Sequence, residues 1–406
     1  MGALTKISAL MADIGGLKME IGASLYKACI RPLLEFAYPV WCCAPIDQIL
    51  KLERVQRIAL LRASGTLNST PTAALEVMTN VPPLRIRYEE ILAQEFIRIH
   101  RKPHTNHLRS MVLQHLDDRS YMDHRILTPL HQIKMAVKDL CREFDPRRVD
   151  HELVYLTERM HSSIVIRATN TWQTLGNSKT RTSIQASAAR KITQQQNSET
   201  DNNWIIAFTD GSALGNPGPC GASAIIYANG MDSEPSSIRK AVSKKSSSYH
   251  GEIYAIYLAV DFTVNYSTTH HIAGIRIFSD CQSAILTVSN STQHNNFTSL
   301  CSDILERVQQ LYDKEIDVDI CWVAGHAGLA ANELACAETK IAAHEAADIE
   351  DAEHQAPLSL LEAKGETRKA VIRKWQHRWD ISETGRTYYQ NKPSVTVKSV
   401  RSKQYR

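Results

Sequence analysis

The sequence has no apolar run long enough to cross a membrane, because none reaches the roughly 18 residues that a spanning helix needs. Its nine cysteines include no C-x-x-C pair and no cysteine and histidine spacing suited to zinc, which excludes the common zinc modules. The start of the chain, M-G-A-L-T-K, has neither a signal-peptide core nor a hydroxyl residue at the position needed for myristoylation. We therefore expect an intracellular protein with reduced thiols and no membrane partner.

An excess of charge of one sign is also missing, since 47 lysines and arginines face 43 aspartates and glutamates, a net charge of +4. So mild an excess does not by itself indicate a nucleic-acid partner, and local clusters must decide that question. With 406 residues, 43% of them apolar and 22% charged, the chain has the composition of a globular protein with two or three domains.

Two apolar runs in the second half of the chain each lead to an aspartate. W-I-I-A-F-T precedes Asp210, and I-R-I-F-S precedes Asp280. Each run predicts a buried strand whose last side chain emerges at the sheet edge, and the ends of neighbouring strands form the site in open α/β sheets. A third carboxylate, Glu252, is predicted to begin a helix whose apolar face includes Ile253 and Val260.

Three carboxylates in this arrangement favour one kind of chemistry. Clustered carboxylates repel one another unless cations lie between them, and Mg²⁺ is typically held by a few carboxylates together with substrate phosphate. Two such ions roughly 3.5–4 Å apart stabilise both the attacking and the leaving oxygen of a phosphoryl displacement. The sequence therefore predicts a nuclease or phosphoryl-transfer site with two Mg²⁺ ions, and Mn²⁺ is the alternative ion.

Four motifs in this region follow one another in a set order. They are T-D-G-S with N-P-G-P behind it, a glutamate opening a helix that contains A-I, S-D-C-Q-S-A, and W-V-A-G-H-A-G-L-A-A-N-E. Together they resemble a type-1 ribonuclease H domain over residues 202–348. The resemblance implies an α/β fold with a five-stranded mixed sheet flanked by helices in the order βββαβααβα. It also implies endonucleolytic hydrolysis of the RNA strand of an RNA–DNA hybrid, which becomes the expected partner.

The resemblance assigns catalytic roles to individual residues. It makes Asp210, Glu252 and Asp280 the metal ligands, and it makes His326 the residue that assists proton movement or product departure. An exposed loop histidine without such a role is the alternative interpretation of His326. Its position between a predicted strand and the last helix of the domain favours the functional interpretation.

The resemblance also implies a surface for the nucleic acid. It places Gly211, Ser212 and Asn216 against the RNA strand, where the 2′-OH distinguishes RNA from DNA. A tight hairpin is the alternative interpretation of that glycine-rich loop. Gln282 and Ser283 begin the next predicted helix, where backbone N–H groups can meet a phosphate. Simple helix capping is an equally weighted alternative for these two residues.

One position departs from the family pattern. Where the family reads N-E-x-A-D and uses the final aspartate as a fourth metal ligand, this chain has Cys336. A thiol has a reference pKa of about 8.5 and favours soft metals over Mg²⁺, so Cys336 is a doubtful ligand. The sequence therefore leaves two functions open. One is a hybrid ribonuclease whose activity is impaired, and the other is a catalytically weakened relic that binds hybrids.

The remaining segments are predicted to be helical or polar. Residues 1–100 form amphipathic helices, and residues 101–201 combine a helical segment with a polar linker. Residues 349–406 form a basic amphipathic tail, in which Trp375 and Trp379 lie on one helical face. These two indoles either pack against a core or stack on bases. We favour packing, with the basic flank of the helix free to bind phosphate.

Both flanks also resemble parts of the reverse transcriptases of jockey-like non-LTR retrotransposons. The motifs are S-L-Y-K-A-C-I-R-P-L-L-E-F-A-Y-P-V-W near the start, and W-Q-H-R-W followed by G-R-T-Y-Y-Q-N-K-P in the tail. The resemblance makes residues 1–100 a connector that follows a polymerase, and it adds other retroelement proteins as candidate partners. The polymerase itself is missing, because no aromatic residue precedes a paired aspartate within a hydrophobic hairpin.

A basic protrusion is absent where cellular ribonucleases H often carry one. Residues 290–297 are few and uncharged at that place. We therefore expect that hybrid affinity comes from outside residues 202–348, because phosphate contacts need cations.

Overall fold

The chain forms two compact units in its computed structural model. One unit comprises Met1–His100, His104–Arg147 and Ala363–Arg406, and the other comprises Arg101–Pro103 and Arg148–Glu362. The residues that the structure describes are 18–102, 105–117, 129–142, 145–150, 167–169, 203–231, 233–289, 298–326, 328–349 and 356–395.

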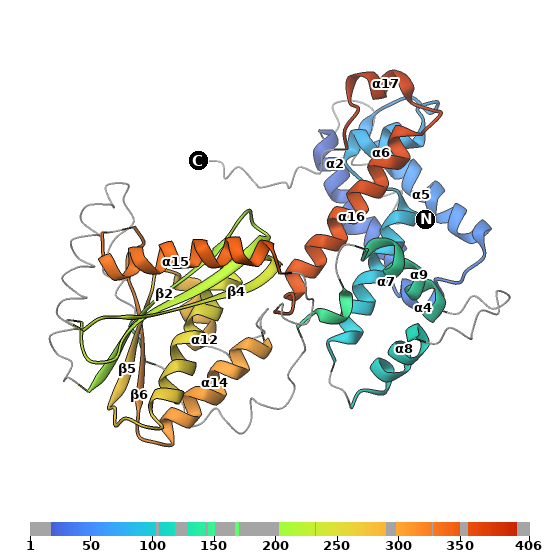
Figure 1. The fold of residues 1–406 in the computed structure, drawn as a ribbon. Coiled ribbons are helices and arrows are strands. Elements are labelled where there is room, and N and C mark those ends of the chain that lie inside the picture. The colour runs from blue at the N-terminus through green and yellow to red at the C-terminus, as the bar shows by residue number, and fades with distance from the viewer. Residues whose placement is uncertain are drawn as a thin grey trace. The chain divides into compact units, whose positions relative to one another are not determined.

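The second unit is built on a six-stranded mixed sheet with the strand order β1-β6-β5-β2-β3-β4 (Figure 1). Three strands form an antiparallel meander, namely β2 (Trp204–Ala213), β3 (Gly218–Tyr227) and β4 (Ser236–Ser246). Two further strands, β5 (Gly274–Ser279) and β6 (Asp317–Trp322), run parallel to β2 and to each other. The sheet is therefore mixed, as the sequence predicted.

Helices follow the strands in the predicted sequence. They are α12 (Ser248–Tyr266), α13 (Gln282–Ser289), α14 (Thr298–Tyr312) and α15 (Ala330–Ala347). From β2 to α15 the chain reads βββαβααβα. The predicted α/β fold class, a ribonuclease H-like mixed sheet flanked by helices and preceded by an all-α region, is confirmed.

The short strand β1 (Arg167–Thr169) was not predicted. It pairs in parallel with β6 at one edge of the sheet, inside the segment 101–201 that was expected to contain helices and a linker. Three residues are too few to show a periodic pattern, so the pairing partner decides their conformation. Two other sequence expectations, the linker over residues 178–203 apart from its last residue and the uncharged stretch 290–297, lie outside the described residues.

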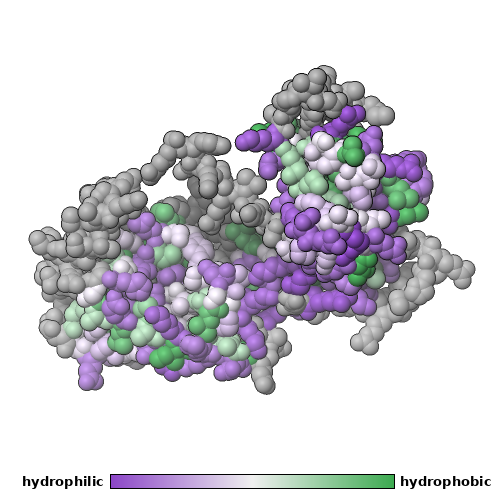
Figure 2. All heavy atoms as spheres, turned by 90° about the horizontal axis from the view of Figure 1, so that it is seen from above, coloured by the Kyte–Doolittle hydropathy of each residue, from purple (hydrophilic) through white to green (hydrophobic). Residues whose placement is uncertain are grey.

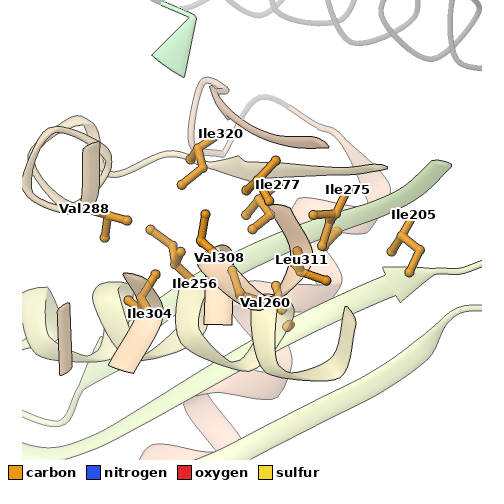
Figure 3. Close-up of a cluster of buried hydrophobic side chains, with 14 of the residues drawn as sticks. Ile205, Ile256, Val260, Ile275, Ile277, Val288, Ile304, Val308, Leu311 and Ile320 are labelled. Atoms are coloured by element: carbon orange, nitrogen blue, oxygen red, sulfur yellow. The ribbon is translucent and has the colours of Figure 1, made fainter. Parts of the chain in front are cut away.

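Helices cover both faces of the sheet, and successive side chains of a strand point to opposite faces. Ile205 and Ile277 belong to the buried cluster shared with α12, α13 and α14 (Figure 3). Ile206 and Phe208 point the other way and pack with Ala335 of α15. The strands therefore read as nearly continuous apolar runs, as expected for strands buried on two sides.

The first unit consists of helices in its described residues. They are α2 (Met19–Leu25), the π-helical turn η1 (Tyr26–Ile30), α3 (Arg31–Glu35), α4 (Tyr38–Trp41), α5 (Ile46–Ser64), α6 (Thr72–Thr79), α7 (Leu84–His100), α8 (His107–Asp117), α9 (Pro129–Leu140), most of α16 (Leu360–Asp380), and α17 (Arg386–Asn391). The predicted helical character of residues 1–100 is confirmed within the described part.

The two tail tryptophans are buried in this helical unit. Trp375 is 2% exposed and Trp379 is 1% exposed, and both belong to a cluster that includes Val77 and Ile86. The indole Nε1 of Trp379 donates a hydrogen bond to the backbone oxygen of Lys392 at 3.0 Å. The predicted packing is confirmed, and these indoles have no exposed face on which a base could stack.

The expectation that the basic flank of this helix is free for phosphate is wrong for several of its cations. Arg368 lies 3.1 Å from a carboxylate oxygen of Glu90, and Lys374 lies 2.5 Å from one of Glu89. Lys369 forms a third ion pair at 2.7 Å within its own helix. The error arose because the acidic partners of the first two lie on α7, far away in the sequence.

The described residues contain no helix that is long and apolar enough to span a membrane. Figure 2 shows hydrophilic side chains over much of the coloured surface, with hydrophobic ones scattered among them. All nine cysteines are free thiols.

Truncation of the sheet core tests this packing. Ile277→Ala is expected to lower the free energy of unfolding by about 2–5 kcal/mol, because it leaves a cavity between β5 and α12. Urea unfolding at constant temperature measures the loss. The matched control is Ile341→Ala, whose side chain is 44% exposed on α15, and a change within about 0.5 kcal/mol is expected there. Equal losses in the two variants would contradict the assigned core.

Candidate active site

Two aspartates lie where the parallel pairing of β2 and β5 ends. The register pairs Thr209 with Ser279, so Asp210 and Asp280 are the next residues of the two segments. The expectation that the strand stops at Asp210 is wrong, because β2 continues in antiparallel pairing with β3, where Asp210 is opposite Ser223. Both aspartates are nevertheless at the same edge, since the parallel part of the sheet ends there.

Glu252 reaches this edge from α12, in the second turn of the helix rather than at its start. The helix backbone lies directly against the sheet. A Cβ atom added at Gly211 would be 2.0 Å from the backbone nitrogen of Glu252, and one added at Gly251 would be 2.6 Å from the carbonyl oxygen of Gly221. No side chain fits at either point, so contact between backbones sets the height of Glu252 above the sheet.

The three carboxylates form one cluster. Asp210, Glu252 and Asp280 each offer an oxygen, and these oxygens lie within 4.8 Å of one another. Within the described residues this is the one group of three or more side chains able to hold a metal ion. The Oε2 atom of Glu252 is buried and has no hydrogen-bond partner. Buried carboxylate oxygens without a partner are costly, and a hard divalent cation suits them.

Burial raises the pKa of all three carboxyl groups, and repulsion within the cluster adds to this effect at Asp210 and Glu252. Burial, followed by the charge of Asp280, raises the pKa of Asp210 to about 6. Burial and the charges of both aspartates hold the pKa of Glu252 well above its ordinary value. Burial also raises the pKa of Asp280, against the opposing effects of neighbouring groups. Such shifts show that the protein alone does not balance these charges, whereas a bound cation would lower every one of them.

Asp280 is held in place by residues that were not among the predicted site residues. The side chain of Asn332 is buried and forms a hydrogen bond that lowers the pKa of Asp280. The indole Nε1 of Trp322 donates to the backbone oxygen of Asp280 at 3.0 Å. A Cβ atom at Gly325 would lie 2.3 Å from Oδ2 of Asp280. The signal in the sequence was the place of Asn332 in the N-E-L-A-C motif.

Cys336 lies beside Asp210, and a hydrogen bond from its side chain lowers the pKa of that aspartate. Its sulfur is not part of the group of atoms within 4.8 Å of one another. Burial and the charge of Asp210 raise the pKa of the thiol, so the sulfur stays protonated at neutral pH. Cys336 is therefore a hydrogen-bond donor to one carboxylate of the cluster.

His326 lies in the segment between β6 and α15, with a left-handed backbone conformation (φ 52°). Its side chain is 76% exposed, and Nδ1 is 3.8 Å from Oε2 of Glu333. When charged, His326 lowers the pKa of Asp210 and of Asp280, which places it close to the carboxylate cluster.

The other predicted site residues lie around this cluster and differ in how exposed they are to solvent. Gly211 is buried under α12, and Ser212 is half-buried in β2. Asn216 is exposed in the hairpin loop between β2 and β3, and Gln282 and Ser283 are exposed in the first turn of α13. Their contact with nucleic acid stays a prediction.

Residues 201–344 match the sequence profile of the RNase H family. None of the curated proteins is similar in sequence to the chain. The solved structures it resembles include the N-terminal RNase H domain of a Mycobacterium tuberculosis protein, fused to maltose-binding protein, at 19% identity over 36% of this chain and 96% of that one, with a TM-score of 0.29. RNase H1 of the archaeon Halobacterium salinarum is similar at 19% identity over 35% and 98%, with a TM-score of 0.28. LC11-RNase H1 from compost, in complex with an RNA/DNA hybrid, is similar at 16% identity over 34% and 98%, with a TM-score of 0.28.

Removing one of the repelling charges tests the electrostatics of the cluster. Ionisation of Asp210 opposes folding, because its pKa rises from 3.8 to about 6 on folding. Stability conferred by the protonated form is therefore lost as the pH rises through roughly 4 to 6. Asp210→Asn is expected to raise Tm in metal-free buffer at pH 8, and the gain should vanish below about pH 4.

Differential scanning calorimetry in EDTA across this pH range measures the effect. Glu234→Gln, which alters an exposed carboxylate of the same unit, serves as the control and should leave Tm unchanged at every pH. A lower Tm for Asp210→Asn at pH 8 would show that the aspartate stabilises the fold and would refute the assigned repulsion.

Proposed function

We propose that residues 202–348 are a type-1 ribonuclease H domain that cleaves the RNA strand of RNA–DNA hybrids endonucleolytically, with two Mg²⁺ ions or Mn²⁺ in their place. The observation that carries this proposal is the cluster of Asp210, Glu252 and Asp280, whose oxygens lie within 4.8 Å of one another in a region that matches the RNase H family.

The donor set suits a hard divalent cation. Three carboxylates, one of them with a buried oxygen that has no partner, offer oxygen ligands and an excess of negative charge. When bound, the ions would neutralise this charge, polarise the scissile phosphate and lower the pKa of a bound water molecule. Asp210, Glu252 and Asp280 would hold them. Asn332 keeps Asp280 oriented through its hydrogen bond, so that the carboxylate does not have to reorganise during the reaction.

His326 would move a proton at the edge of this site. Its imidazole is exposed, close to both aspartates and 3.8 Å from Glu333. A histidine in such a position can take a proton from water or give one to the departing 3′ oxygen, because its ordinary pKa lies near neutral pH.

The substrate would lie over the hairpin loop and the start of α13. Ser212 and Asn216 present polar groups beside the cluster, and Gly211 lets the backbone approach closely. These groups can meet the 2′-OH, which is what separates RNA from DNA. Gln282 and Ser283 are exposed at a helix N-terminus, where a phosphate is favoured.

The flanking motifs support a retroelement origin for the chain. We propose that the helical residues 1–100 are a connector that follows a polymerase in a reverse transcriptase of the jockey-like class, and that other retroelement proteins are further partners. The retained order of helical region, ribonuclease H-like domain and tail supports this assignment.

A catalytically weakened relic that binds hybrids is the second candidate. Cys336 favours it, because a protonated thiol replaces the carboxylate that the family uses as a fourth ligand. A site with three carboxylates can still bind a cation, but the second ion would have fewer oxygen ligands.

A cleavage assay on defined duplexes tests the proposed function. The full chain in Mg²⁺ or Mn²⁺ is expected to release 5′-phosphorylated RNA fragments from an RNA–DNA hybrid and to leave RNA–RNA and DNA–DNA duplexes intact. The cleavage rate of Asp210→Asn should be more than about a hundredfold lower than that of the native chain, because a metal ligand is removed. Glu234→Gln should keep the native rate. Hybrid binding without cleavage in either ion would support the relic, and no hybrid binding at all would reject both candidates.

Restoring the carboxylate tests the role of Cys336. Cys336→Asp is expected to raise turnover in Mg²⁺ by about tenfold or more, because an oxygen ligand replaces a protonated sulfur. Cys336→Asn, which is of similar size and carries no charge, is the matched control and should give no gain. Equal rates for the native chain and Cys336→Asp would remove Cys336 from the explanation of any weak activity.

A further inference from the structure

The carboxylate of Glu362 joins the beginnings of two helices in the sheet unit. Its Oε2 accepts a hydrogen bond from the backbone nitrogen of Ser359 at 2.9 Å, and Ser359 Oγ accepts one from the nitrogen of Glu362 at 3.2 Å. These two bonds are a capping box at the start of α16. Its Oε1 accepts from Ser246 Oγ at 2.8 Å and from the nitrogen of Ser247 at 2.5 Å. Ser247 is the N-cap of α12, the helix that carries Glu252.

These contacts are enclosed within the protein. Glu362 is 9% exposed, and Ser246 and His250 are almost fully buried. His250 Nδ1 lies 2.7 Å from Ser246 Oγ. Because the hydroxyl hydrogen of Ser246 is given to Glu362, the ring nitrogen of His250 must donate in this pair. A continuous chain of hydrogen bonds therefore runs from the first turn of α12 to a residue more than a hundred positions later.

The segment before Glu362 is also attached to this unit. The nitrogen of Ala356 donates to the carbonyl oxygen of Val242 in β4 at 2.9 Å. Leu358 forms an isolated parallel bridge with Val149, and its nitrogen donates to the oxygen of Arg148 at 2.9 Å. The segment from Ala356 to Leu358 is therefore fixed before α16 begins at Leu360, so Glu362 is held in place from its own side.

The first turn of α12 transmits this restraint to the carboxylate cluster. Ser247 and Glu252 are separated by little more than one helical turn, and the backbone between them lies against Gly211 and Gly221 without intervening side chains. The Oε2 atom of Glu252 has no hydrogen-bond partner, and the hydrogen bond that lowers the pKa of this carboxyl group comes from the backbone of Gly211. The position of the carboxylate is therefore set by the backbones of α12 and β2, and any shift of the first turn of α12 moves it relative to the sheet.

We propose that Glu362 is a positioning residue, which holds the first turn of α12 against the sheet and so places Glu252 in the carboxylate cluster. The working unit of the site then extends to residue 362. The metal-binding consequence rests on the proposed function, whereas the restraint on α12 does not.

Hydrogen–deuterium exchange of the full chain measures that restraint directly. Glu362→Ala is expected to speed exchange of the amides in residues 246–256 by about tenfold, because the hydrogen bonds that tie Ser246 and Ser247 to Glu362 are lost. In parallel, Mn²⁺ binding without substrate, followed by electron paramagnetic resonance, is expected to weaken by about tenfold, as for other residues that orient a metal ligand.

Ser359→Ala is the matched control, because it weakens the capping box of α16 and leaves both hydrogen bonds that Glu362 accepts from Ser246 and Ser247. It should keep exchange in residues 246–256 and Mn²⁺ affinity within about twofold of the native chain. If Glu362→Ala does not fold, Glu362→Gln replaces it. Its amide oxygen can still accept from Ser246 and Ser247, so Glu362→Gln should lose less protection at residues 246–256 than at residues 359–363.

The outcomes separate the two proposals. Unchanged exchange in residues 246–256 for Glu362→Ala, or equal effects of Glu362→Ala and Ser359→Ala there, would overturn the positioning role. A native chain whose Mn²⁺ binding is insensitive to Asp210→Asn would overturn the proposed metal site instead, and the exchange result would still decide the role of Glu362.

Discussion

The close approach of α12 to the sheet is the constraint on which the site depends. Gly211 and Gly251 leave no side chain between the helix and β2, and a Cβ atom at either place would collide with backbone. On the opposite face a Cβ atom at Gly221 would lie 2.4 Å from the nitrogen of Ala343, so α15 is equally close. The helices α12 and α15 thus enclose β2, the strand that carries Asp210, from its two faces. This geometry lets a helical carboxylate reach carboxylates at the ends of strands.

Close packing also creates the electrostatic problem that a metal ion would solve. Asp210, Glu252 and Asp280 lose most of their water when the helices close over the sheet, and burial is the largest cause of each raised pKa. Cys336 and Asn332 relieve part of this cost by hydrogen bonding to the aspartates. They do not supply positive charge. The surrounding apolar core must therefore stabilise a site that is unfavourable without a cation.

In the helical unit, charged side chains of one helix form ion pairs with those of another. Cations of α16 pair with acidic residues of α7, and Trp375 and Trp379 fill the core between the helices. A basic helix that follows a ribonuclease H-like domain in the sequence is easily interpreted as a nucleic-acid surface. Here the buried indoles and the ion pairs show that much of this helix serves the packing of its own unit. The same residue types serve either purpose, and their neighbours determine which.

The sequence alone indicated the strands that lead to Asp210 and Asp280 and the helix that carries Glu252, because apolar periods and strand-ending Asp-Gly or Ser-Asp steps are local signals. The order of all the elements came from the resemblance to ribonuclease H. The sequence also indicated the buried face of the helix with Trp375 and Trp379. Only the tertiary structure decided that β1 joins the sheet, that Asn332 supports Asp280, and that Glu362 accepts a hydrogen bond from the N-cap residue of α12. These contacts join residues far apart along the chain. No local pattern encodes them, because they arise from the way in which the folded elements meet.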